Sequence, residues 1–144
     1  MDEPELAVFL SQHAGQAPAA REYAQTLADL GYEPWTDTDE AAPGVDLNPR
    51  LALEFERSCA AIFVLSRQIS DATLLSGEVE RALDQRRRKR ERFAIIALVF
   101  ERDHDAIVVP PGLRRHCSEA TTVLEGLRVI LRALPVKLGP PTWR

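Results

Sequence analysis

One carboxylate is the side chain in this sequence that is best placed to do chemistry. Glu78 follows the apolar run of residues 60–66 and falls early in the helical pattern of residues 73–88. At 100° per residue it lies on the edge of an apolar stripe made of Leu75, Val79, Ala82 and Leu83. Desolvation at such a border raises the pKa of a carboxyl group, and groups of this kind are candidates for functional residues.

Two other interpretations compete with a catalytic role for Glu78. In the first, Glu78 has a structural role, capping a neighbouring loop or pairing with an arginine. In the second, Ser11, His13 and an acid such as Asp37 form a hydrolase triad. No segment resembles the nucleophile elbow that presents the serine in such enzymes, so the triad is the weaker hypothesis. Glu80 points well away from the apolar stripe and is not a candidate.

Metal and dinucleotide motifs are missing from the sequence. His104 and His116 lie in predicted loops without paired ligands at metal spacing. Cys59 and Cys117 match no metal-ligand spacing either, and we expect them to be buried, reduced thiols. Neither a G-x-G-x-x-G segment nor a Walker-type loop is present. We therefore expect no metal site, and a nucleotide would have to bind without the Rossmann fingerprint.

Basic side chains are concentrated in one segment. Residues 81–92 carry a charge of +5, whereas the rest of the chain carries −9. The run Arg86–Arg90 has no interleaved aromatic residues that could stack on bases, so nucleic acid is not the expected partner. Cations near the C-terminus of a helix are favoured by the helix dipole. We expect a solvated turn here, with an oligomer contact as the second choice.

The elements that position these residues alternate between strands and helices. Short apolar runs predict strands at 6–11, 32–36, 60–66, 93–100 and, more weakly, 119–123. Amphipathic patterns predict helices at 18–30, 47–57, 73–88 and 124–134. Gly31 is a natural helix stop, and the acidic segment 37–46 contains a Pro-Gly turn. This order predicts an α/β fold, a flavodoxin-like doubly wound sheet of five parallel strands with helices on both faces.

The predicted sheet determines where a ligand would bind. In open parallel sheets, ligands bind outside the carboxyl ends of the strands, near the topological switch point. The loops after Ser11, Thr36 and Ser66 are therefore the places to look for function. We expect one domain over residues 1–134, followed by a Pro/Gly-containing tail or linker over residues 135–144.

Several segments resemble, in order, motifs of the TIR (Toll/interleukin-1 receptor) domain family over about residues 5–134. They are the first strand at 7–11, the second strand at 31–37, the BB loop with Pro43 and Gly44, and the third strand at 60–66. The helix that follows is similar to the family's W-x-x-x-E pattern. Leu74 stands at the position of its tryptophan and Glu78 at the position of its glutamate.

The resemblance implies a function of the bacterial NAD-cleaving type. Glu78 would be the catalytic residue for cleaving NAD, which would be the substrate, and no resident cofactor would be needed. Residues near the same pocket would contact NAD: Ser11, Gln12, His13, Trp35, Asp37, Gly44, Val45 and Leu74. The loop 37–46 would gate the pocket or join neighbouring subunits, and self-association would activate the enzyme. A sensor domain, attached or separate, and a bacterial immune or cell-suicide role are implied in the same way.

Three alternatives remain to be weighed. A response-regulator receiver needs an aspartate at the end of the third strand, and Leu65-Ser66 stands there instead. A nucleoside-deoxyribosyltransferase-like enzyme stays open, because it shares the sheet and a catalytic glutamate, but the acidic Pro-Gly loop favours TIR. A non-enzymatic TIR scaffold that recruits other TIR domains is the main alternative, and Leu74 in place of tryptophan favours it.

Composition restricts the location and the partners. The net charge is −4, and the acidic first residues lack the basic start of a signal peptide. No apolar run approaches the roughly 18 residues that would suggest a membrane span. We expect a cytoplasmic domain that works neither in a membrane nor as a general nucleic-acid binder.

Overall fold

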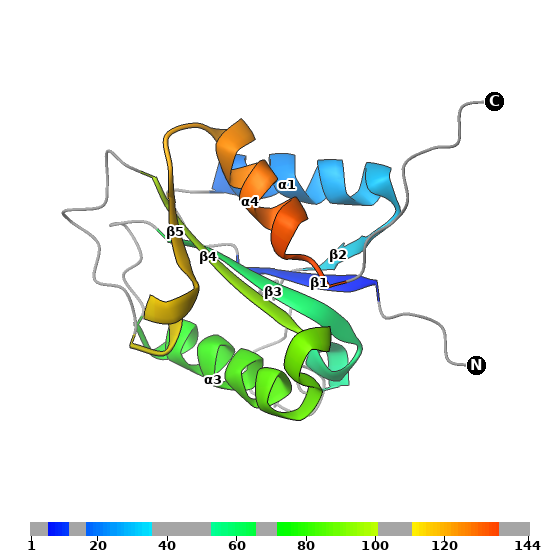
Figure 1. Cartoon of the computed structure of the whole chain (residues 1–144), viewed down its shortest axis with the longest axis vertical. Helices are drawn as coiled ribbons and strands as arrows, with labels where there is room; N and C mark the ends of the chain where they lie inside the picture. Colours follow the sequence, from blue (N-terminus) through cyan, green and yellow to red (C-terminus); the bar gives the residue numbers. More distant parts are fainter. Residues whose placement is uncertain (1–5, 12–16, 36–52, 66–71, 101–110, 136–144) are drawn as a thin grey trace, which may run out of the picture.

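Five parallel strands form the centre of the molecule (Figure 1). The computed structural model describes residues 6–11, 17–35, 53–65, 72–100 and 111–135, with only the backbone described at 17–19, 72–78, 100 and 111. The strand order is β2-β1-β3-β4-β5, and every neighbouring pair is parallel. The strands are β1 (Ala7–Ser11), β2 (Glu33–Trp35), β3 (Ser58–Leu65), β4 (Ala94–Phe100) and β5 (Cys117–Ala120). The predicted doubly wound α/β fold is confirmed.

The strand β3 is buried along its whole length because it lies between two other strands and between two helical layers. All eight of its residues are buried, and it pairs with β1 on one side and β4 on the other. Successive side chains point to opposite faces of the sheet. Ile62 and Val64 therefore join one core cluster, while Phe63 and Leu65 join the other. A continuous apolar run is what a strand in this position requires.

The helices cover the two faces unequally. The helices α1 (Ala17–Leu30) and α4 (Val123–Ala133) lie together on one face, and α3 (Ala72–Lys89) covers the other (Figure 1). Two short 3-10 helices accompany α3: η1 (Arg90–Arg92) continues from its end, and η3 (Pro111–His116) leads into β5. Within the described residues, no helix is long and apolar enough to cross a membrane. A further helical turn is described at residues 53–56, inside the predicted helix 47–57, whose first residues lie outside the described part.

Most boundaries agree with the sequence prediction to within two residues, and Gly31 ends α1 with a φ of 106° as expected of a helix stop. The last strand is the exception, since β5 ends at Ala120 and α4 already begins at Val123. Thr122 caps that helix by accepting a hydrogen bond from the backbone N–H of Glu125. The Glu125 carboxylate accepts one in return from the N–H of Thr121, at 2.6 Å. This reciprocal capping ends the strand earlier than the apolar pattern indicates.

A buried tyrosine joins α1 to α4. Tyr23 is only 1% exposed, and its hydroxyl donates a hydrogen bond to the backbone oxygen of Val123 at 3.0 Å. Gly126 lies one turn further along α4, and a Cβ added there would overlap the Tyr23 hydroxyl. Glycine at this position thus lets the tyrosine reach a carbonyl at the start of the neighbouring helix. Burial, with a smaller contribution from the negative charge of Glu22, raises the pKa of Tyr23 to about 12.

We predict that Gly126→Ala destabilises the domain despite the higher helix propensity of alanine. Overpacking against a buried ring typically costs about 1–3 kcal/mol, which exceeds the gain of about 1 kcal/mol in propensity. Urea unfolding of wild type, Gly126→Ala, Tyr23→Phe and the double variant measures the coupling. Because Tyr23→Phe removes the overlapping oxygen, the cost of Gly126→Ala should fall by about 1 kcal/mol in that background. Equal costs in both backgrounds would contradict the contact.

We also predict that the stability contributed by the Tyr23 hydroxyl is lost at alkaline pH. The folded chain holds the phenolic proton more tightly than the unfolded chain, whose tyrosine pKa is about 10. The contribution is therefore complete below pH 10 and decreases as the pH rises toward 12, by up to about 1.4 kcal/mol per pH unit. The quantity to measure is the difference in unfolding free energy between wild type and Tyr23→Phe from pH 8 to 11. A difference that stays constant above pH 10 would refute the shift.

Candidate functional site

The strand order places a switch point between β1 and β3. From β1, the chain builds outward first to β2 on one side and then to β3, β4 and β5 on the other. At such a point the crossover connections leave to opposite faces, which opens a crevice outside the carboxyl ends of the two strands. The ends in question are Ser11 of β1 and Leu65 of β3, because Ser11 pairs with Phe63 in the register of the two strands.

Ser11, one of the predicted site residues, lies at the carboxyl end of β1, and the structure describes its side chain. It is the last residue of β1 and is only 2% exposed, one of three buried polar residues among those described. A serine hydroxyl both donates and accepts hydrogen bonds. A buried hydroxyl therefore lies at the carboxyl end of the first strand, and its predicted contact with NAD stays a prediction.

Glu78 lies on α3, the helix that follows β3. It is in the second turn, and one and two turns further along are Ala82 (0% exposed) and Gln85 (4% exposed). Residues at these spacings share one side of a helix, so position 78 belongs to the side that faces the sheet. The predicted apolar stripe is confirmed in its described part, since Val79, Ala82 and Leu83 pack in the core beneath β3 and β4. The catalytic role of Glu78 stays a prediction.

Glu80 provides the contrast on the same helix. It is exposed, whereas its neighbour Val79 is 5% exposed. The two glutamates therefore occupy different sides of α3, as expected from a rotation of 200° over two residues. Comparing variants at positions 78 and 80 therefore distinguishes a specific role of Glu78 from a general effect of a carboxylate in this part of the helix.

Trp35 ends β2 and takes part in an aromatic cluster. Its ring lies 4.8 Å from that of Phe9 and 5.2 Å from that of Phe55, between centroids. The indole N–H donates a hydrogen bond to Ser58 Oγ at 2.7 Å, and Ser58 Oγ in turn donates to the backbone oxygen of Glu54 at 2.8 Å. Ser58 begins β3, so the indole N–H is directed to the end of the strand opposite the crevice. Its predicted contact with NAD stays a prediction.

The remaining predicted site residues are not tested by the structure. Gln12, His13, Asp37, Gly44 and Val45 lie outside the described residues. Leu74 falls in the first turn of α3, where only the backbone is described. The hypothetical triad of Ser11, His13 and Asp37 is untested for the same reason.

Metal ligation finds no support among the described side chains. No group of three or more His, Cys, Asp or Glu in that part of the chain could hold a metal ion. Neither cysteine forms a disulfide, and Cys59 is buried as predicted, whereas Cys117 is only half-buried. The pKa of His116 is lowered by burial and by the positive charges of Arg86 and Arg115. Both effects favour the neutral form of His116, and the charged side chains that act on it are cations rather than potential metal ligands.

The basic run at the end of α3 is only partly a solvated turn, so the sequence prediction was wrong for two of its members. Lys89 Nζ donates hydrogen bonds to the backbone oxygens of Glu56 and Ser58. Arg86 Nη1 donates to the backbone oxygens of Arg90 and Phe93, each at 2.7 Å. The cause is that long cationic side chains near a helix C-terminus reach unpaired carbonyls. That rule could have indicated the local contacts of Arg86, whereas Glu56 and Ser58, which accept from Lys89, are distant in sequence.

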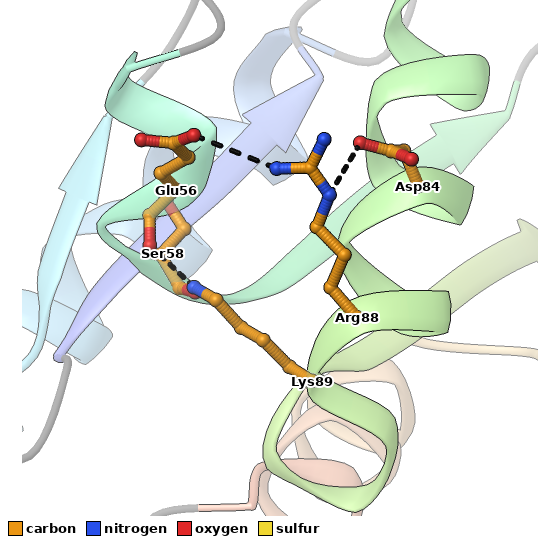
Figure 2. A network of polar contacts seen from close by, with 5 residues as sticks. All are labelled: Glu56, Ser58, Asp84, Arg88 and Lys89. Atoms are coloured by element: carbon orange, nitrogen blue, oxygen red, sulfur yellow. Dashed lines mark hydrogen bonds and ion pairs between the residues drawn. The ribbon is translucent and has the colours of Figure 1, made fainter.

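Figure 2 shows how these contacts connect α3 to the start of β3. Lys89 reaches Ser58, while Arg88 forms ion pairs with Glu56 at 3.6 Å and with Asp84 at 3.2 Å. The ion-paired side chains are largely exposed, at 61% for Arg88, so solvent screens their attraction and they contribute little to stability. The contacts of Lys89 with backbone oxygens are the directional ones.

Comparison with known proteins agrees with the fold and the switch point. A sequence profile of the TIR domain matches residues 8–122. A search of curated protein sequences gave no significant match. Among solved structures, the chain is similar to the TIR domains in the structure of the activated Roq1 resistosome directly recognizing the pathogen effector XopQ. The TM-score is 0.54 and the identity 16%, over 88% of this chain and 69% of that chain. At this identity the likeness shows the fold alone, whereas the profile covers most of the chain, and the protein therefore belongs to the TIR domain family.

Proposed function

We propose that the domain cleaves the nicotinamide–ribose bond of NAD, with the Glu78 carboxylate as the catalytic group. The observation that supports the proposal is that a TIR domain has Glu78 on the helix after β3, one and two turns before the buried residues Ala82 and Gln85. That helix follows β3, which is paired with β1 at the switch point of the sheet. Some TIR domains are enzymes of this kind, and Glu78 stands at the position of their catalytic glutamate.

The chemistry requires one acid rather than two. When the bond between C1′ of the ribose and the pyridinium nitrogen breaks, its electron pair neutralises the ring, so nicotinamide leaves without being protonated. The ribose becomes oxocarbenium-like, and a carboxylate beside it stabilises the developing positive charge. Water then adds at C1′ and loses a proton to give ADP-ribose, or the adenine end adds to give a cyclic isomer. Ordinary glycosidases need a second carboxyl group because their leaving group must be protonated.

The substrate contacts follow from the same proposal. Ser11, Gln12 and His13 come at the end of β1, and the acidic segment 37–46 comes after β2. Both connections leave from the carboxyl ends of neighbouring strands, where a dinucleotide would lie. Self-association through TIR–TIR contacts, including the segment 37–46, would activate the enzyme, in a bacterial immune or cell-suicide response. A sensor domain, attached or separate, would supply the trigger.

A non-enzymatic scaffold is the second candidate. Leu74 stands where the enzymes of the family have tryptophan, which removes an aromatic ring from the neighbourhood of position 78. A scaffold would recruit other TIR domains through the same surfaces and would not depend on the carboxylate.

We predict that Glu78→Gln abolishes NAD cleavage, lowering the rate by at least about 100-fold, because the neutral amide cannot stabilise the developing cation. Nicotinamide release and the second product should be measured at high protein concentration with a crowding agent, since assembly is expected to be required. Glu80→Gln is the matched control, because it removes an exposed carboxylate from the same helix. It should leave the rate unchanged.

Light scattering on the same samples distinguishes the two candidate functions. Glu78→Gln should assemble like wild type if the carboxylate acts in catalysis. Wild-type protein that assembles fully and still releases no nicotinamide would refute the enzyme and favour the scaffold. Equal losses of activity in the Glu78 and Glu80 variants would also refute a specific role for position 78.

A further inference from the structure

Residues 79–89 of α3, the part of the helix whose side chains are described, contact the sheet through a few apolar side chains. Between residues 79 and 89, the buried side chains of α3 are Val79, Ala82 and Gln85, with Leu83 partly buried. In this part of the helix, one valine, one alanine and part of a leucine supply the apolar contact with the sheet. Apolar contact is also non-directional, so it resists separation of helix and sheet more than sliding or rotation. Directional contacts must therefore set the position of the helix along its axis.

Lys89 makes such contacts with the start of β3. Its Nζ donates to the backbone oxygen of Ser58, the first residue of that strand, at 2.8 Å, and to the backbone oxygen of Glu56 (Figure 2). The ammonium group also lies 5.7 Å from the centre of the Phe93 ring. Hydrogen bonds from a charged donor are stronger and shorter than those between neutral groups. The end of α3 is thus tied to the first residue of the most buried strand.

Arg86 makes the corresponding contact with the start of β4. Its Nη1 donates to the backbone oxygen of Phe93, the residue before that strand, at 2.7 Å. It also donates to the backbone oxygen of Arg90, which closes the turn between α3 and β4. Arg86 and Lys89 are three residues apart, on one side of the helix, yet they reach two different strands. Two anchor points on neighbouring strands restrain both the axial position and the rotation of the helix.

Position 78 shares the side of the helix on which these anchors lie. Lys89 is eleven residues further along, slightly more than three full turns, so the two positions differ by only about 20° around the axis. They are about 16 Å apart along it. Because an α-helix is stiff over this length, a shift or rotation at the end held by Lys89 is transmitted to position 78.

We propose that Arg86 and Lys89 are positioning residues, a two-point clamp on the starts of β3 and β4 that fixes position 78 of α3 relative to the sheet. The proposal rests on the proposed function in taking Glu78 as the carboxylate that acts. In this proposal, two residues of the basic run at the end of α3 hold the helix in position, and they act neither as part of a solvated turn nor as a nucleic-acid-binding surface. The clamp lies at the amino ends of the strands and acts on a site at their carboxyl ends.

The kinetic test uses Lys89→Met and Arg86→Met, each of which keeps an apolar stem but removes the donors of one anchor. Misplacement of a catalytic group by about 1 Å costs on the order of 100-fold in rate, so we expect kcat to fall at least tenfold in each variant. KM for NAD should stay within about twofold, because the substrate contacts come from other elements. Arg87→Met, at an exposed position of the same turn, is the control and should match wild type. Lys89→Arg retains a charged donor and should recover most of kcat.

A fall in kcat that Arg87→Met reproduces, or a change confined to KM, would overturn the clamp. Measurements belong well below the unfolding temperature of each variant, with the fold checked by circular dichroism. Each single variant keeps the other anchor, so the helix remains attached to the sheet.

Hydrogen exchange tests the clamp without reference to activity. In Lys89→Met, the amides of residues 78–82 should lose protection by about threefold or more, together with those of the last helical turn. Loss confined to residues 86–90 would show that the anchor holds only its own turn and would overturn the proposal. If the wild-type domain cleaves no NAD under any condition, the proposed function fails, and the exchange result still decides whether the clamp exists.

Discussion

The burial of β3 on every side is the constraint on which the rest of the structure depends. A strand with apolar residues on both faces and a partner on each edge can exist only inside a sheet that has helices above and below. Parallel pairing then requires a crossover between consecutive strands, and the crossovers supply those helices. The same arrangement aligns the carboxyl ends of β1 and β3 at one edge. The position of Ser11 at this edge is thus a consequence of how the core is buried.

Polar contacts then decide how the helices sit on the sheet. On one face, the Tyr23 hydroxyl bonds the first carbonyl of α4 across a glycine, which brings α1 and α4 close together. On the other face, Lys89 and Arg86 hold α3 to the starts of β3 and β4. The difference has a physical reason, since residues 79–89 of α3 bury only the small apolar side chains of Val79 and Ala82, whereas α1 buries Tyr23 and Leu27 completely. A helix with a narrow apolar face depends more on directional bonds for its position.

The family and the chemistry rest on different kinds of support. Membership of the TIR domain family follows from a profile that spans most of the chain and from the fold. The family contains enzymes and scaffolds that share this sheet, so the fold does not choose between them. The choice depends on one carboxylate and its surroundings. Position 78 is in the second turn of the helix after β3, where an enzyme of the family would need its carboxylate. In contrast, the leucine at position 74 lacks the aromatic ring that those enzymes have there.

The sequence by itself determined the strands, most helix boundaries, the parallel sheet and the stripe that places position 78, because each follows from local periodicity. The run of residues 60–66 required a doubly buried strand, and Val79 with Ala82 required a sheet-facing helix side. What only the tertiary structure decided are contacts between residues far apart in the chain. Trp35 bonding to Ser58, Tyr23 bonding to Val123 and Lys89 bonding to Ser58 join segments that no local pattern relates. A cation in the last turn of a helix has the same sequence signature whether it meets water or a carbonyl, and only the packing of the strands beneath it settles which.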